Sequence, residues 1–290
     1  MIIDAHNHPE YQGQDFVHAI QNMDRYGIDM TWLLSWECPP DEYEPRYRGV
    51  MPMVGGNGPA PFARCLAWAE RAPDRFILGY CPDPRQPDAV DRLQAAVKVL
   101  GVRVCGELKL RMMYDNPDAL RLFRYCATEK LPVVLHLDYE YETGQTYPRP
   151  SWWYGGGIEA LERALKACPD TMFLGHAPGF WTHISGTGVD STDPYPTGPV
   201  TPGGQVVRML RTYPNLYGDI SAQSGLNALS RDPGFGREFL DEFQDRLLFA
   251  RDDYDNAHQE FLRTLDLPPA QLSKILSGNA LRLVPLGRTQ

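Results

Sequence analysis

Short apolar runs alternate with amphipathic segments along almost the whole chain. Eight runs rich in apolar and β-branched residues are bounded by turn residues, as expected for buried strands. They cover residues 1–4, 30–36, 76–80, 102–110, 133–137, 172–175, 216–220 and 247–250. Segments with a helical apolar period lie between them and predict helices at 15–26, 62–71, 88–100, 117–129, 158–168, 205–212 and 236–243, followed by a helical tail over 256–286.

This alternation predicts the fold class. Strands that alternate with helices indicate parallel βαβ units, and eight such units predict an α/β fold, the (β/α)8 TIM barrel. The segments after several strands are long (37–61, 138–156 and 177–203), whereas the helix-to-strand links are short. Because a TIM barrel carries its site on the loops at the C-terminal face, we expect the functional site there. We expect a single domain over residues 1–290.

Composition and charge narrow the class of protein. The 290 residues are 43% hydrophobic and 22% charged, which is typical of a globular domain. A net charge of −9 argues against a nucleic-acid partner, because nucleic-acid binding needs a basic surface. No apolar run is long enough for a membrane span, and the start MIIDAHNH lacks the features of a secretion signal. We therefore expect a cytoplasmic protein with no membrane partner and with reduced cysteines.

Histidines follow the predicted strands at their C-terminal ends. His6 and His8 are two residues apart, so on an extended chain they point to the same face and form half of a metal site. His136 and His176 end the fifth and sixth strands, and Asp219 ends the seventh, where it is a candidate to support a ligand. One histidine at a strand end is usually a satisfied polar group, but four of the seven histidines at such ends indicate a site.

Acidic residues end the fourth and eighth strands. Glu107 lies on the fourth strand, and alternation places it on one face with Cys105 and Lys109. Asp252 and Asp253 follow the eighth strand. A mixed cluster of imidazoles and carboxylates favours zinc, iron, manganese or nickel over calcium.

The same segments resemble the amidohydrolase superfamily, specifically the amidohydrolase-2 group of metal-dependent TIM-barrel hydrolases and decarboxylases. The resemblance covers nearly the whole chain, and the ordered set of HxH, two further histidines and an aspartate is its most specific part. It is carried by IIDAHNH (2–8), VVLHLD (133–138), FLGHAPG (173–179), LLFARDD (247–253) and ILSGNALRLVPL (275–286), with APDRFILGYCPDP and PNLYGDIS as further matches.

The resemblance implies a divalent metal ion at the strand ends and a role for each residue of the motif. Asp252 would be a ligand and also the general base, with Asp253 as the alternative carboxylate. His176 would be a further ligand or would orient the attacking water. The implied ligands besides Asp252 are His6, His8 and His136.

The identity and number of the metal ions stay open at this point. We expect Zn²⁺, with Mn²⁺, Fe²⁺ and Ni²⁺ as alternatives. One ion is the default, and two are expected if Glu107 is a ligand, because related barrels with an acid on the fourth strand use it to bridge two metals. A structural or substrate-pairing role for Glu107 and a carboxylated, bridging Lys109 are the alternatives.

Candidate substrate-binding residues lie near the ligand-bearing strand ends and on the loops. Arg111 and Arg251 could each bind a substrate carboxylate through two hydrogen bonds. Asp138 and His183 could face the pocket, and Trp153 belongs to an aromatic stretch that could form its wall. For each of these residues a structural ion pair, a solvated loop position or loop packing is the alternative.

The sequence therefore predicts an enzyme, a metal-dependent hydrolase that cleaves an ester, lactone or amide bond of a small, carboxylate-bearing substrate with metal-activated water. The alternative on the same frame is a non-oxidative decarboxylase, a carboxy-lyase acting on an aromatic or unsaturated acid. A metal-binding sensor without turnover and a TatD-like nuclease are further alternatives, and the acidic charge weighs against the nuclease. Barrels of this group often pair, so a homodimer is one expected state, and the oligomeric state stays open.

Overall fold

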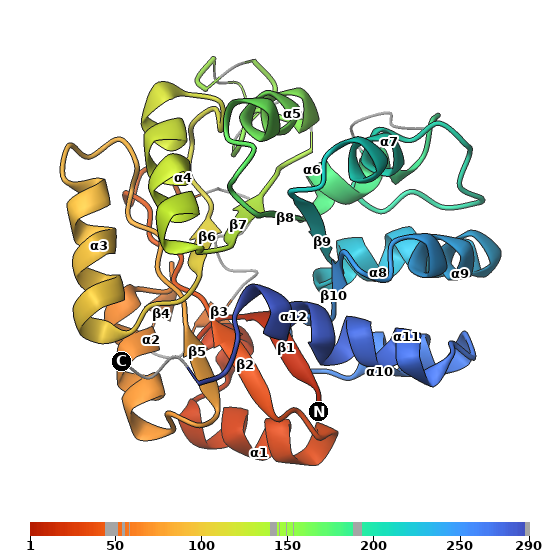
Figure 1. Cartoon of the computed structure of the whole chain (residues 1–290), viewed down its shortest axis with the longest axis horizontal. Helices are drawn as coiled ribbons and strands as arrows, with labels where there is room; N and C mark the ends of the chain where they lie inside the picture. The colour runs from red at the N-terminus through yellow and green to blue at the C-terminus, as the bar shows by residue number, and fades with distance from the viewer. Residues whose placement is uncertain are drawn as a thin grey trace.

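The computed structural model of the chain describes residues 1–43, 52–53, 56–57, 59–139, 144, 146–148, 150–152, 154–187 and 193–287. Parallel strands surround a common centre, and the helices lie outside them (Figure 1). The eight predicted strands are all present: β1 (Ile3–Asn7), β2 (Met30–Leu33), β5 (Phe76–Leu78), β6 (Cys105–Leu108), β7 (Val133–His136), β8 (Phe173–His176), β9 (Leu216–Asp219) and β10 (Leu247–Leu248).

The predicted helices are present with small shifts at their ends. None among the described residues is long and apolar enough to cross a bilayer. They are α1 (Phe16–Tyr26), α2 (Phe62–Arg71), α3 (Ala89–Leu100), α4 (Pro117–Glu129), α5 (Ile158–Ala167), α7 (Gln205–Thr212) and α9 (Pro233–Glu242), with α10 (Ala257–Thr264), α11 (Pro269–Ser273) and α12 (Asn279–Leu283) in the tail.

Several elements lie where no regular structure was predicted. The short helix α6 (Pro178–Trp181) begins directly after β8, and α8 (Ala222–Ser230) begins directly after β9. A two-stranded antiparallel pair, β3 (Pro52–Met53) and β4 (Gly56–Asn57), lies within the predicted loop 37–61. These elements are short or lack a clear apolar period, so the hydrophobic pattern carries little signal for them.

The strands form two parallel sheets that together make the barrel wall. One sheet has the order β1-β2-β5 and the other the order β10-β9-β8-β7-β6. At one seam, the Ala5 N–H donates to the carbonyl of Phe249 at 3.0 Å. At the other seam, the Tyr80 N–H donates to the carbonyl of Val104 at 3.0 Å, and Arg103 N–H donates to Leu78 at 2.9 Å. These backbone hydrogen bonds join the two sheets into a ring, as the predicted TIM barrel requires.

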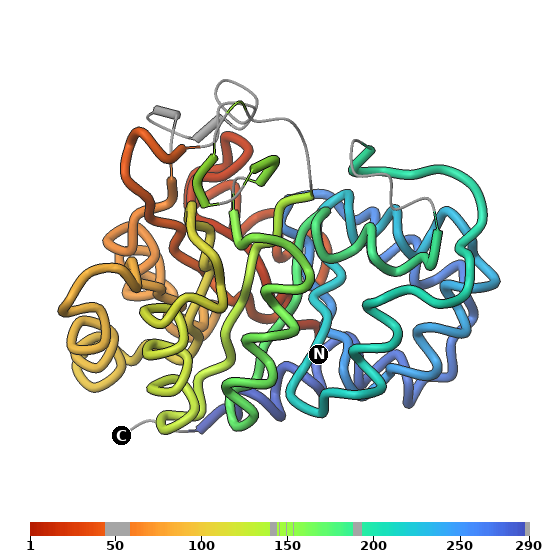
Figure 2. Tube along the Cα trace, turned by 90° about the horizontal axis from the view of Figure 1, so that it is seen from above, coloured from red at the N-terminus to blue at the C-terminus, as the bar shows by residue number. Residues whose placement is uncertain are grey.

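A compact apolar core fills the part of the barrel interior that lies away from the C-terminal ends of the strands. Each of the eight strand segments contributes inward-facing residues to it, and alternate residues pack outward against the helices. Residues of the C-terminal segment pack against this core. In Figure 2 the blue C-terminal segment runs along the bottom of the view. The interior residues are Ile3, Ala5, Trp32, Leu34, Ile77, Val104, Val134, Leu174, Tyr217, Leu248 and Ala250, with Ala280 and Val284 from the C-terminal segment.

Two strands break their regular pairing close to the polar residues of the barrel mouth. The register of β1 against β2 shifts between Asp4 and Asn7, and that of β6 against β7 shifts between Cys105 and Leu108. Such irregularities change which way a side chain points. The expectation that Cys105 and Glu107 share a face is wrong for this reason: Cys105 packs in the outer core, whereas Glu107 faces the interior.

A buried ion pair ties the first strand to the end of the last. The Arg251 Nε donates to Asp4 Oδ2 at 2.8 Å, and the Arg251 backbone N–H donates to Asp4 Oδ1 at 2.8 Å. The same guanidinium donates to Asn22 Oδ1 at 2.8 Å. Arg251, which the sequence offered as a carboxylate-binding residue, is therefore engaged in holding the barrel together.

We expect the substitution Asp4→Asn to lower the free energy of unfolding by about 3–5 kcal/mol, because it leaves the buried Arg251 charge uncompensated. Urea denaturation monitored by circular dichroism measures the change. The control is Asp24→Asn, which breaks the surface pair between Asp24 and Arg75 and should cost at most about 1 kcal/mol. Equal losses in the two variants would contradict a structural role for the buried pair.

Candidate metal centre

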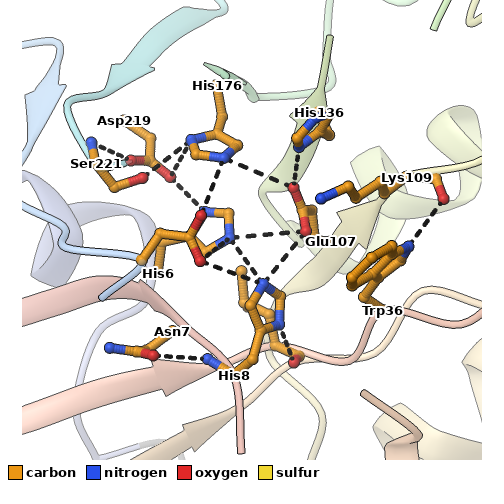
Figure 3. A network of polar contacts seen from close by, with 12 residues as sticks. His6, Asn7, His8, Trp36, Glu107, Lys109, His136, His176, Asp219 and Ser221 are labelled. Atoms are coloured by element: carbon orange, nitrogen blue, oxygen red, sulfur yellow. Dashed lines mark hydrogen bonds and ion pairs between the residues drawn. The ribbon is translucent and has the colours of Figure 1, made fainter. Parts of the chain in front are cut away.

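A cluster of buried titratable side chains lies where the strands end at the barrel mouth (Figure 3). Its members come from both sheets, so the barrel must close before they meet. The structure brings together the sequence-predicted residues His6, His8, Glu107, His136, His176, Asp219 and Asp252, called here the cluster.

Two carboxylate oxygens of the cluster lie near the Nε2 atoms of His6 and His8. The Nε2 atoms of His6 and His8 are 3.3 Å apart. Glu107 Oε2 lies 3.3 Å from the His8 Nε2 and 3.9 Å from the His6 Nε2. Asp252 Oδ1 lies 3.6 Å and 4.0 Å from the same two nitrogens. Ligand atoms about 2.1 Å from a tetrahedral ion lie about 3.4 Å from one another, so this spacing is close to that of a metal site.

The carboxylates of Glu107 and Asp252 show most directly whether a metal ion would fit the site. Glu107 Oε2 and Asp252 Oδ1 are both buried, and neither accepts a hydrogen bond from any residue that the structure describes. A buried carboxylate oxygen without a donor is costly, and buried polar groups are normally satisfied. Two such oxygens facing two imidazole nitrogens form a donor set that a divalent transition metal or zinc would satisfy.

Hydrogen bonds behind the imidazoles fix which nitrogen faces the cluster. The His6 Nδ1 lies 2.6 Å from Asp219 Oδ2, and the His8 Nδ1 lies 2.9 Å from the carbonyl oxygen of Leu34. An Nδ1 that donates in these hydrogen bonds leaves Nε2 facing the cluster, where it can take up a proton or a metal ion. Asp219 therefore contacts His6, one of the ligands that the family resemblance implies.

Glu107 lies between two groups of histidines. Its Oε2 faces His6 and His8, while its Oε1 accepts a hydrogen bond from His136 Nδ1 at 2.8 Å and lies 3.7 Å from His176 Nε2. The described residues offer three triads of potential ligands. These are His6–His8–Glu107, His6–His176–Asp252 and Glu107–His136–His176. The last triad places His136 with Glu107 and His176, whereas the family resemblance grouped it with the HxH pair.

His176 lies beside the carboxylate of Asp252. Its Nε2 lies 3.6 Å from Asp252 Oδ2, and its Nδ1 is hydrogen-bonded to Ser221 Oγ at 3.0 Å. Burial, reinforced by the nearby His6, lowers the pKa of His176 well below its usual value. A neutral imidazole in this place can accept a metal or a proton at Nε2.

The carboxylates set the charge of the cluster. Burial by itself would lower the pKa of His6, but Asp219, Asp252 and Glu107 outweigh burial and raise it to about 10. Burial raises the pKa of Asp252, and the neighbouring Glu107 adds to that effect. Burial would also raise the pKa of Glu107, but the positive charge of Lys109, with that of His136, holds it well below its usual value. The negative charge of the carboxylates therefore stabilises a positive charge in the cluster, either a proton on His6 or a metal ion.

The two aspartates after β10 have different surroundings. Asp252 takes a left-handed backbone conformation (φ 48°), and its carboxylate points at the cluster. Asp253 Oδ1 accepts the backbone N–H of Tyr254 at 2.6 Å. This geometry favours Asp252 over Asp253 as the carboxylate of the site.

Of the predicted substrate-binding residues, Asp138 lies beside the cluster, whereas Arg111 and His183 interact with other parts of the chain. Asp138 is buried at the edge of the cluster, where its Oδ1 lies 3.7 Å from His136 Nε2. Arg111 donates from Nη2 to the carbonyl oxygen of Tyr147 at 2.7 Å and from Nε at 3.0 Å, so its guanidinium holds a loop. Burial lowers the pKa of His183, and the charge that acts on it is Glu159 of α5 rather than the cluster. Trp153 lies outside the described residues.

Trp36 and Ser221 contact the cluster but were not among the predicted site residues. The ring centroid of Trp36 lies 6.5 Å from that of His8, and its face lies 4.0 Å from Lys109 Nζ. Trp36 follows β2 at the barrel mouth, so its strand-end position was an available signal. Ser221 follows Asp219 by two residues, which gave no comparable signal.

A family model described as Amidohydrolase matches residues 3–286. No protein of curated function matches the sequence. Many solved structures share the fold, among them the following three. An uncharacterised TIM-barrel protein from Bordetella bronchiseptica is 18% identical, with 97% of each chain covered and a TM-score of 0.66. A dihydroxybenzoic acid decarboxylase from a Polaromonas species, with bound manganese, is 18% identical (91% and 84% covered, TM-score 0.54). A probable 2-pyrone-4,6-dicarboxylic acid hydrolase from Acinetobacter baumannii is 14% identical (97% and 98% covered, TM-score 0.58).

Protein purified without chelator should contain at least one divalent ion per chain, and the His6→Ala/His8→Ala variant should lose it, because two of the converging nitrogens are removed. Mass spectrometry of metal content measures this. His18→Ala, which removes an exposed histidine of α1, is the control and should keep the ion. A folded double variant with full metal content would place the ion elsewhere.

Metal affinity should rise with pH. Below about pH 10 the metal-free protein holds a proton on His6, and an ion must displace that proton, so the apparent dissociation constant should fall about tenfold per pH unit and level off above that pKa. Competition titrations against a chelator of known affinity at pH 6 to 9 measure the slope, and calorimetry in two buffers counts the protons released. A slope of zero with no proton release would contradict the role of His6.

Proposed function

This chain belongs to the amidohydrolase family, and from that premise we propose that it hydrolyses an ester, lactone or amide bond of a small, carboxylate-bearing molecule in a metal-dependent reaction. One observation carries the proposal. Two imidazole nitrogens and two buried carboxylate oxygens without hydrogen-bond donors converge at the barrel mouth.

The residues that would hold the ion are His6, His8, Glu107 and Asp252. When bound, a divalent ion supplies Lewis-acid chemistry, because it lowers the pKa of water and polarises a carbonyl oxygen. A second ion would use Glu107 Oε1 with His136 and His176. The mixed nitrogen and oxygen donors suit Zn²⁺ and also Mn²⁺, Fe²⁺ or Ni²⁺, and the Polaromonas decarboxylase of the same fold contains manganese.

Asp252 and His176 are the proposed proton-transfer groups. Burial raises the pKa of Asp252, which makes its carboxylate a better proton acceptor than an exposed aspartate. Asp252 would take the proton from the attacking water and return it to the leaving group. His176 Nε2, 3.6 Å from Asp252 Oδ2, would orient that water and accept a hydrogen bond from it.

The alternative, decarboxylation of an aromatic or unsaturated acid, is supported by neighbours of the same fold that are named as decarboxylases. An arginine that clamps the carboxylate would support such a reaction. Arg251 is instead paired with Asp4, and Arg111 holds the Tyr147 carbonyl. Neither arginine therefore supports the decarboxylase over the hydrolase, and hydrolysis stays the proposal.

The test is a panel of phenyl esters, lactones and anilides, followed by release of acid, beside a panel of aromatic acids, followed by release of carbon dioxide. We expect hydrolysis without carbon dioxide release, and Asp252→Asn should lower kcat by about 10²–10⁴-fold because general-base catalysis is lost. The matched control is Asp253→Asn, which should keep activity. Metal content is measured in both variants.

Each contrary outcome selects another function. Carbon dioxide release without hydrolysis would replace the proposal with a decarboxylase. A metal-loaded protein that acts on neither panel would favour a sensor, and cleavage of DNA would favour a nuclease. Full hydrolysis by Asp252→Asn with loss in Asp253→Asn would exchange the roles of the two aspartates.

A further inference from the structure

Lys109 is a buried cation that the proposed reaction does not use. It lies just after β6, two residues beyond Glu107, and only 5% of its surface is exposed. Taking an ammonium group out of water is costly unless its surroundings stabilise the charge. Its position at the mouth of the barrel, beside the cluster, therefore needs a physical reason (Figure 3).

Two aromatic rings hold the ammonium group in place. Lys109 Nζ lies 4.0 Å from the ring centroid of Trp36 and 6.0 Å from that of Tyr154, within the range of cation–π attraction. Both rings are fixed by hydrogen bonds of their own. The Trp36 Nε1–H donates to the Lys109 carbonyl at 3.2 Å, and the Tyr154 hydroxyl donates to the Glu42 carbonyl at 3.1 Å.

The same two rings reach from Lys109 to the cluster. Trp36 lies 6.5 Å from the ring of His8, and Tyr154 lies 5.9 Å from the ring of His136, both measured between centroids. A group bound at Lys109 is therefore within the length of a small acyl compound from the converging Nε2 and carboxylate atoms. Planar rings on this path suit a planar, unsaturated or aromatic substrate.

Within the part of the chain that the structure describes, three arginines near the mouth are engaged in the structure itself. Arg251 is paired with Asp4, and Arg111 binds the Tyr147 carbonyl. Arg85 is paired with both Asp83 and Glu42. The cluster itself is rich in carboxylates, which repel an anion. An anionic substrate therefore needs a cation next to the cluster, and Lys109 has that position.

We propose that Lys109, on the platform of Trp36 and Tyr154, binds the carboxylate of the substrate and so selects esters, lactones or amides whose aromatic or unsaturated part carries that carboxylate. This inference rests on the proposed hydrolytic function and adds to it the residue that sets the substrate class. A charge-assisted hydrogen bond from the ammonium group to a carboxylate oxygen provides the selectivity.

The test compares two esters that differ in charge, 4-carboxyphenyl acetate and 4-carbamoylphenyl acetate, with the metal-loaded protein. Lys109→Met removes the charge but keeps an unbranched side chain, Lys109→Arg keeps the charge, and Lys98→Met alters an exposed lysine of α3 as the control. In Lys109→Met, the ratio of kcat/KM for the acid ester over the amide ester should fall about 10- to 100-fold, the size of one hydrogen bond to a charged group. The fall should lie mainly in KM, and Lys109→Arg should restore part of the ratio.

A binding measurement gives a readout that does not depend on turnover. Calorimetric titration with 4-hydroxybenzoate and with 4-hydroxybenzamide should show that the wild-type protein prefers the acid and that Lys109→Met loses this preference. The preference of the wild-type protein needs no variant, so the proposal stays testable if Lys109→Met does not fold. Wild-type protein that binds the amide as tightly as the acid would overturn the proposal.

The remaining outcomes separate this inference from the proposed reaction. If Lys109→Met loses metal or loses both esters equally, Lys109 acts only through its charge on Glu107 and the substrate role is wrong. If no ester is cleaved by any protein but Lys109→Met loses 4-hydroxybenzoate binding, the anion site is correct and the hydrolytic function is wrong. An unchanged ester ratio with normal hydrolysis would leave the function standing and overturn the anion site.

Discussion

Negative charge buried in the barrel mouth is the constraint on which the rest of the site depends. Glu107 and Asp219 are almost wholly buried, and the Asp252 side chain is 14% exposed. Carboxylates in such a place must be met by hydrogen-bond donors or by positive charge. Asp219 is met by His6 and by the Ser221 backbone N–H. Glu107 Oε2 and Asp252 Oδ1 face the imidazole nitrogens of the HxH pair instead, and this arrangement defines a candidate position for a cation.

The fold separates this polar layer from the layer that stabilises the barrel. The lower interior is apolar and receives side chains from all eight strand segments. The upper layer departs from regular geometry, with register shifts in β1 and β6 and a left-handed backbone at Asp252. Such departures re-aim side chains and are common at functional sites. The apolar core stabilises the barrel, so the fold tolerates an irregular backbone at the mouth.

The sequence predicted the strands and most of the cluster because both depend on local signals. Short apolar runs mark the strands, and histidines at their ends mark the mouth of the barrel. Partners distant along the chain gave no such signal. Arg251 was offered as a substrate residue, but its partner Asp4 lies 247 positions earlier. The face of Cys105 depends on its pairing with β7. An aromatic residue such as Trp36 is most often core, so its contact with Lys109 could not be predicted from its type.

The division of the candidate ligands between the two sheets has a consequence for how the barrel assembles. His6 lies on β1 and His8 directly follows it, in the sheet β1-β2-β5, whereas Glu107 and His176 lie on β6 and β8 of the other sheet. A chain opened between β5 and α3 would give two fragments, one with the imidazole pair and one with the carboxylates. Neither fragment holds the full donor set, so the free energy of metal binding would add to their association. In such a split protein, the ion would act as the ligand that recruits one half of the barrel to the other.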